Sequence, residues 1–95
     1  GDYGKPRPAL VIQSDLFAEH PSVTVLLLTG ELHDALLLRV TVQPTPENGL
    51  EKASQICVDK AATLPRAKIG QRIGRLDDAT LLEVSRRLAL FLGFV

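Results

Sequence analysis

The chain has 95 residues, of which 45% are hydrophobic and 23% charged, and its eleven basic and eleven acidic residues cancel to no net charge. This composition predicts one globular domain and excludes both a disordered chain and a strongly basic nucleic-acid coat. Aromatic residues make up only 4% of the chain, which argues against a sheet that stacks bases. The single cysteine, Cys57, allows no intrachain disulfide, gives no zinc pattern and favours a reducing, cytoplasmic location.

The first predicted strand, residues 7–13, begins with an arginine that stands between two prolines. Pro6 and Pro8 each fix φ and bias the preceding residue toward extended geometry, so Arg7 lies on a stiff lead-in to the apolar run of residues 9–12. A cation held in this way is suited to binding a phosphate, because the guanidinium fork matches two phosphate oxygens. Taken alone, Arg7 is better explained as an ordinary surface arginine than as a phosphate-binding residue.

Further strands are predicted from apolar runs and from alternation of apolar and polar residues. The most apolar contains three consecutive leucines, Leu26 to Leu28, and we expect it to be covered on both faces. The last is interrupted by Gly70 and Gly74, which indicate a bulge or a close backbone approach. The predicted ranges are residues 23–29, 36–43, 53–59 and 69–76.

A helix is predicted after the strands, where the apolar period changes to that of a helix. Asp77 is a good N-cap, and Gly93 stands where a helix commonly ends. The apolar stripe is wide, so we expect the helix to pack on its own sheet and also against a second subunit. Strands followed by one helix predict an α+β domain with a twisted, partly closed sheet.

Five segments together resemble the MazF/PemK/Kid toxins of bacterial toxin–antitoxin pairs. The first, R-P-A-L-V-I-Q-S-D, resembles the family's entry strand, which begins with an arginine. The second, V-L-L-L-T, resembles the family's apolar strand that ends in threonine. Each motif alone is weak, but the set occurs in the family's order over nearly the whole chain. The matching segments are residues 7–15, 25–29, 38–42, 49–60 and 73–78.

The resemblance implies a small SH3-like β-barrel of about five strands with a C-terminal α-helix. It also implies a homodimer, a cognate antitoxin that covers the RNA groove, and no cofactor or membrane. The implied activity is a sequence-selective, metal-independent endoribonuclease that cuts single-stranded mRNA and inhibits growth. The whole chain, residues 1–95, is expected to be one toxin domain, and the family's usual opening strand, R-G-(D/E)-I-(W/Y), is expected to be missing from it.

Metal-free RNA cleavage uses the 2′-OH as the nucleophile. It needs a base for that proton, a cation for the charge of the phosphorane and an acid for the leaving 5′-oxygen. Arg7 is the predicted cation, Thr29 is predicted to bind a non-bridging oxygen, and Asp59 matches the family's acidic position, proposed as base or RNA contact. The predicted RNA contacts are Lys5, Gln13, Lys60 and His33, and no metal ligand is predicted.

Two positions depart from the family pattern. Cys57 stands where some members carry a basic residue two positions before the acid, and Gly30 stands where a serine often follows the threonine. The first departure favours Arg7 with Thr29, rather than an Arg–Asp acid–base pair, as the catalytic groups. The second is expected to loosen the turn after Thr29.

Other interpretations stay open at this point. Thr29 alone would be a strand-end hydroxyl, Asp59 a turn residue and His33 a solvated loop histidine. A gyrase poison of the CcdB type would share the fold, but this chain ends in L-G-F-V and lacks the Trp-Gly-Ile ending expected of such poisons. A non-catalytic barrel that acts as a binding module is the third alternative.

Overall fold

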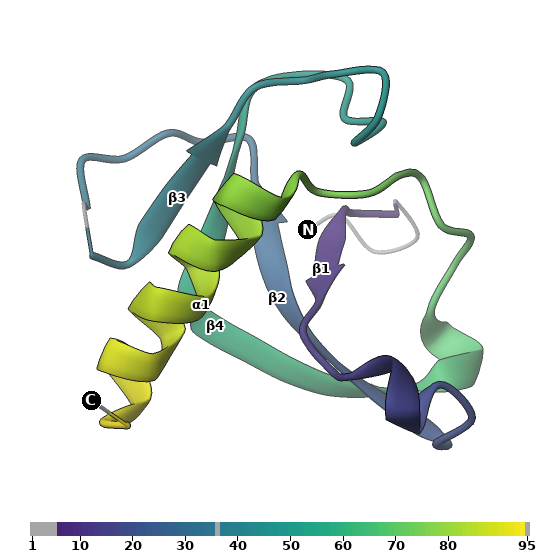
Figure 1. Ribbon diagram of the computed structural model, residues 1–95. Helices are drawn as coiled ribbons and strands as arrows, with labels where there is room; N and C mark the ends of the chain where they lie inside the picture. The colour runs from purple at the N-terminus through teal and green to yellow at the C-terminus, as the bar shows by residue number, and fades with distance from the viewer. Residues whose placement is uncertain (1–5, 36, 95) are drawn as a thin grey trace.

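A computed structural model describes residues 6–35 and 37–94, and these form one antiparallel sheet with a helix packed on it (Figure 1). The sheet has four strands in the order β1-β2-β4-β3, which leaves β1 and β3 at its edges. The α+β architecture with a C-terminal helix is therefore confirmed. The elements are β1 (Ala9–Val11), η1 (Asp15–Phe17), β2 (Ser22–Thr29), β3 (Arg39–Val42), β4 (Ser54–Pro65), η2 (Arg66–Lys68) and α1 (Asp78–Leu92).

The predicted fifth strand is wrong, because residues 69–77 form no helix or strand. A close backbone approach holds this segment instead: a Cβ on Gly74 would stand 2.4 Å from the carbonyl oxygen of Glu47. The next residue, Arg75, donates its backbone N–H to that same oxygen at 2.8 Å. The glycine therefore marks a backbone contact, as expected, but the contact is with a turn and not with a strand.

Strand β4 continues six residues beyond its predicted end at Asp59 and reaches Pro65. Its pairing with β2 explains the difference. Leu28 of β2 pairs with Ile56, whereas Leu26 pairs with Ala61, so β4 carries extra residues between these two points. Such a bulge bends a strand and increases its twist. The bend turns β4 along the whole length of β2, and the sheet curls into a half-barrel (Figure 1).

The main core lies between α1 and the face of the sheet that it covers. Strands β2, β3 and β4 contribute aliphatic side chains at alternate positions, and α1 contributes the only residue of that helix classed as buried, Val84. Burying such side chains supplies about 1.5–3 kcal/mol each. The buried cluster consists of Leu26, Leu28, Val40, Val42, Ile56, Val58 and Val84.

Helix α1 has the predicted ends. The Asp77 side chain accepts the backbone N–H of Thr80 at 3.0 Å, and Gly93 takes a left-handed φ of 80° that ends the helix. The predicted wide apolar stripe is only partly used by the sheet, since several large apolar side chains of α1 and of the residues just after it remain exposed. These are Leu81, Leu82, Leu90, Phe91, Leu92 and Phe94. In the described part of the chain no helix is long and apolar enough to cross a membrane.

Candidate functional site

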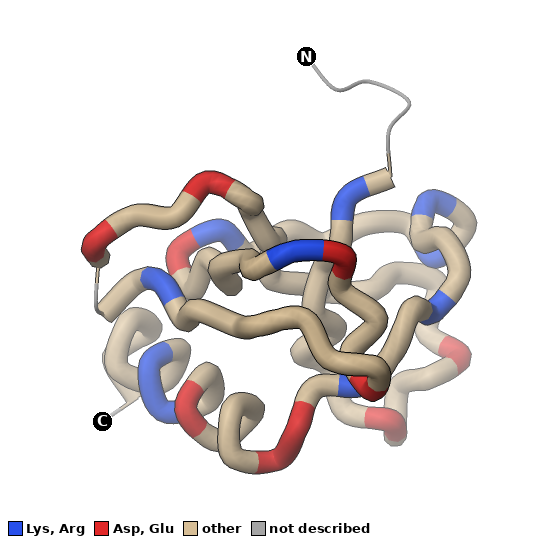
Figure 2. The backbone as a smooth tube through the Cα atoms, turned by 90° about the horizontal axis from the view of Figure 1, so that it is seen from above, with Lys and Arg blue, Asp and Glu red and all other residues tan. Residues whose placement is uncertain are grey.

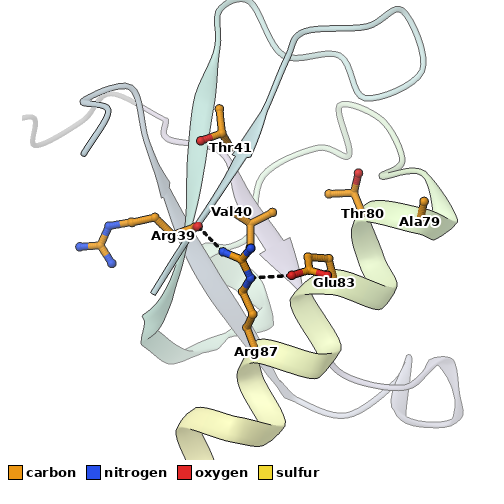
Figure 3. Close-up of a pocket in the computed structure, with 7 residues that line it drawn as sticks. All are labelled: Arg39, Val40, Thr41, Ala79, Thr80, Glu83 and Arg87. Carbon is orange, nitrogen blue, oxygen red and sulfur yellow. Dashed lines mark hydrogen bonds and ion pairs between the residues drawn. The ribbon is translucent and has the colours of Figure 1, made fainter. Parts of the chain in front are cut away.

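The sheet has a second face, opposite α1, that carries polar side chains. On β3 the core residues alternate with Arg39 and Thr41, and on β4 they alternate with Gln55 and Cys57. Figure 3 shows the guanidinium of Arg39 on the side of β3 away from α1. We call this side, which carries Arg39, Thr41, Gln55 and Cys57, the outer face.

Strand register places Arg7 opposite Thr29 on the outer face. In the β1–β2 pair Ala9 lies opposite Leu27, so the same register extended by two residues sets Arg7 against Thr29. The backbone N–H of Leu28 donates to the carbonyl of Pro8 at 3.3 Å, which continues the pairing beyond the assigned strand. Pro8 has no N–H to return to Leu28, and it stands just before the first residue of an edge strand, which is where a proline is tolerated. Two of the three predicted catalytic residues thus lie on neighbouring strands.

The hydroxyl of Thr29 is oriented by the turn that follows it. Thr29 Oγ1 accepts the backbone N–H of Glu31 at 3.1 Å, which leaves its own O–H to donate to another group. At Gly30, where the missing serine is expected to loosen the turn, the end of the Lys52 side chain occupies the space where a side chain would stand. A Cβ on Gly30 would lie 2.5 Å from Lys52 Cε.

Asp59 pairs with an arginine that the sequence did not single out. Arg39 Nη1 lies 2.5 Å from Asp59 Oδ1, and the two side chains are 15% and 27% exposed. The desolvation of Asp59 raises its pKa, but the hydrogen bond from Arg39 and the charges of Arg39 and Lys60 outweigh this, so the net pKa lies below the ordinary value. Arg39 of β3 lies directly opposite Cys57 of β4. Strand β3 therefore supplies a guanidinium beside the position of Cys57, where the family pattern described above has a basic residue in some members.

The three predicted catalytic residues take part in two different pairs. Thr29 lies opposite Gln55, and Asp59 is four residues further along β4, among the extra residues 57–60 of the bulge. The outer face therefore holds two pairs, Arg7 with Thr29 by register and Arg39 with Asp59 by an ion pair.

Gln55 is a further outer-face residue that the sequence did not indicate. It is only 5% exposed, and its side-chain amide binds the backbone of His33 in the β2–β3 loop, residues 30–38. No local pattern signals this contact, because the two residues are 22 positions apart. The His33 imidazole itself is 58% exposed and lies 4.0 Å from the carboxylate of Glu31.

The other predicted RNA contacts have different surroundings. The Gln13 amide donates to the carbonyls of Phe17 and Ser22 at 3.3 Å and accepts the N–H of Thr24 at 3.0 Å, so it holds the turn after β1. Lys60 is exposed on β4 beside Asp59. Lys5 lies outside the described residues.

A groove of about 450 Å³ lies on the other side of β3, between that strand and α1. Figure 3 shows Arg87 of α1 reaching into it and joining Glu83 to the backbone oxygen of Arg39, at 2.7 Å in each case. The predicted site residues do not line it. Figure 2 shows charges of both signs distributed around the molecule rather than gathered on one side. No cluster of three or more His, Cys, Asp or Glu side chains suited to a metal occurs within residues 6–35 and 37–94.

Known proteins match this chain over almost its full length. Residues 1–92 match the family described as the PemK-like, MazF-like toxin of type II toxin–antitoxin systems. A relative from Mycolicibacterium smegmatis, the "probable endoribonuclease MazF", is 44% identical over 90 residues, which cover 95% of this chain and 83% of the relative.

Solved structures agree on the fold. The Mycobacterium tuberculosis toxin MazF-mt6 has a TM-score of 0.82 at 24% identity, covering 94% of this chain and 88% of that one. A mycobacterial endoribonuclease in complex with its cognate antitoxin has a TM-score of 0.81 at 23% identity, covering 99% and 88%. A MazE–MazF structure from Deinococcus radiodurans has a TM-score of 0.76 at 21% identity, covering 94% and 87%. By its sequence match and its relative, the chain belongs to the PemK-like, MazF-like toxins of type II toxin–antitoxin systems.

Proposed function

We propose that this protein is a sequence-selective endoribonuclease toxin that cleaves single-stranded mRNA without a metal and so inhibits growth. Family membership and the relative named as a MazF endoribonuclease support the reaction class. The observation that carries the proposal is the register that sets Arg7 against Thr29 on the outer face. Nothing in the structure favours the gyrase poison or the binding module over this reaction.

The reaction is an attack of the ribose 2′-OH on the adjacent phosphorus. The 2′-OH releases its proton to solvent and its oxygen forms a bond to phosphorus, while the bond to the 5′-oxygen breaks and that oxygen takes up a proton from solvent. The products are a 2′,3′-cyclic phosphate and a 5′-hydroxyl. Arg7 binds two oxygens of the phosphate through its fork and stabilises the charge that grows on them. Thr29 donates its O–H to a non-bridging oxygen, since its acceptor side is already used by Glu31.

Asp59 has a supporting role in this proposal. Because Arg39 and Lys60 contribute to a net lowering of its pKa, its carboxylate is a weak base at neutral pH. Its pairing with Arg39 instead fixes that guanidinium on the outer face. His33, Lys60 and Lys5 are proposed as RNA contacts, and Gln13 is proposed to act through the turn that its amide holds.

The proposed partners are an antitoxin and a second copy of the chain, both in the cytoplasm. Solved relatives include an endoribonuclease with its cognate antitoxin and MazE–MazF complexes. The exposed apolar side chains of α1, among them Leu90 and Phe91, give a surface suited to a homodimer.

The test is cleavage of a long single-stranded RNA in the presence of EDTA. We expect the wild-type protein to cut, Arg7→Ala to abolish cutting, and Arg7→Lys to restore only a small part, because an ammonium lacks the bidentate fork. Arg86→Ala is the matched control, since Arg86 is an exposed arginine on α1, and it should cut like wild type. Intact RNA with the wild-type protein, or full cutting by Arg7→Ala, would contradict the proposal.

A further inference from the structure

We propose that Gln55 is a positioning residue that fixes the β2–β3 loop beside Thr29 and thereby sets which nucleotides flank the cleaved bond. This inference rests on the proposed ribonuclease function. Gln55 does not touch the RNA in this proposal. It acts through the loop that it holds.

The contact is a clamp on one residue of the loop. Gln55 Oε1 accepts the backbone N–H of His33 at 2.9 Å, and Gln55 Nε2 donates to the backbone C=O of His33, also at 2.9 Å. A third bond runs from Nε2 to Thr41 Oγ1 at 3.1 Å and fixes the amide against β3. The Gln55 side chain thus uses its acceptor and both of its donors, as a buried amide requires.

The clamp is placed next to the proposed phosphate site. Gln55 is the direct cross-strand neighbour of Thr29, and Thr29 faces Arg7 in the extended register. The backbone of His33 therefore lies against the outer face one strand away from the threonine that is proposed to bind the phosphate. A nucleotide next to the cleaved bond has to pass this loop.

The clamp also leaves the loop side chains available. Both bonds from Gln55 to His33 use the His33 backbone, so its imidazole, which is 58% exposed, is not part of the clamp. The loop begins beside Lys52, whose side chain packs over Gly30, and it is held again at His33. A segment fixed through its backbone keeps its shape whatever its side chains are, which suits a loop that reads a substrate.

The experiment compares Gln55→Met with wild type in mapping of cleavage sites on a long RNA. Methionine keeps the length of the side chain and removes all three bonds. We expect kcat/KM at the preferred site to fall about 10²-fold, as for a displaced positioning contact, and the cuts to spread over more sequences. Thr41→Val is the matched control: it removes only the third bond and should keep the wild-type cleavage pattern. Should Gln55→Met not fold, Gln55→Glu replaces it, because it loses the bonds donated by Nε2 and keeps the acceptor.

Two results separate the inference from the proposed function. A folded Gln55→Met protein with wild-type cleavage sites and kcat/KM overturns the inference alone, whereas a wild-type protein that cuts no RNA overturns the proposed function. The clamp has its own readout without RNA. The backbone N–H of His33 should exchange slowly with solvent in the wild-type protein and faster in Gln55→Met, and an unprotected N–H in wild type would contradict the clamp.

Discussion

The outer face carries two cross-strand arginine pairs whose partner residues differ in charge. Arg7 faces Thr29 across β1 and β2, and Arg39 bonds Asp59 across β3 and β4. Asp59 neutralises its arginine, whereas Thr29 brings a hydroxyl and no charge. A guanidinium beside a hydroxyl that can donate is suited to a phosphate, while a guanidinium bonded to a carboxylate is suited to holding two strands together. The cross-strand partner thus distinguishes the arginine that we propose to be catalytic from the one that joins two strands.

The largest expected effect comes from making the first pair resemble the second. Thr29→Asp places a carboxylate opposite Arg7, where it pairs with the guanidinium and repels the phosphate. We expect RNA cleavage to fall at least about 10³-fold, measured as initial rates with EDTA present. Thr29→Asn is the control, since it has nearly the same shape without the charge and should retain clearly more activity. Equal activity of the two variants would show that charge does not distinguish the pairs.

A smaller loss is expected when only the hydroxyl is removed. Thr29→Val keeps the β-branched shape of the strand end and deletes the donor to the phosphate. Removing one such donor typically lowers kcat by about 10²-fold. The melting temperature should change little, because the hydroxyl accepts only the N–H of Glu31 in the folded protein. A Thr29→Val enzyme with wild-type kcat would remove Thr29 from the proposed site.

How far the sequence anticipates this arrangement depends on the range of each interaction. The helix ends at Asp77 and Gly93 are set by neighbouring residues and were predicted, as were the cores of the four strands. The fifth strand was wrong because a backbone contact between Gly74 and Glu47, far apart in sequence, has the same glycine signal as a bulge.

The candidate site shows the same limit. Arg7 and Thr29 could be singled out because each lies at the end of a readable strand. Arg39 and Gln55 could not, because alternation predicts only their face, and their partners are 20 and 22 residues away. The bulge in β4 is invisible in the alternation, so the sequence could not give the position of Asp59 relative to Thr29.

A moderate effect on stability is expected when the second pair is opened. Asp59→Ala leaves the guanidinium of Arg39 without its carboxylate at a site only 15% exposed. Leaving such a group unpaired costs about 1–3 kcal/mol in the free energy of unfolding, which urea denaturation can measure. Cleavage should fall less than in Thr29→Val. The double variant Arg39→Met/Asp59→Leu should recover much of the stability, because two apolar groups leave no buried charge unpaired; a double variant no more stable than Asp59→Ala would contradict this.

The smallest effect is on the acid side of the stability curve. Desolvation raises the pKa of Asp59, but Arg39, the backbone N–H of Asp59 and Lys60 lower it further, so it lies below its ordinary value of 3.8 when the protein is folded. The unfolded chain therefore binds more protons in the window between the two values. Stability from this pair is fully present above the ordinary value and is lost as the pH falls through the lowered one.

Asp77 contributes with the same sign, since the hydroxyl and the backbone N–H of Thr80 lower the pKa of its carboxyl. Thermal unfolding of the wild-type protein should therefore show a melting temperature that falls as the pH drops below about 4. Asp59→Asn removes one of the two carboxylates, so its curve should start lower at neutral pH and fall less steeply on acidification. Parallel curves for the two proteins would mean that the Arg39–Asp59 pair adds no pH-dependent stability, and the contrast between the hydroxyl opposite Arg7 and the carboxylate bonded to Arg39 would then rest on the cleavage data alone.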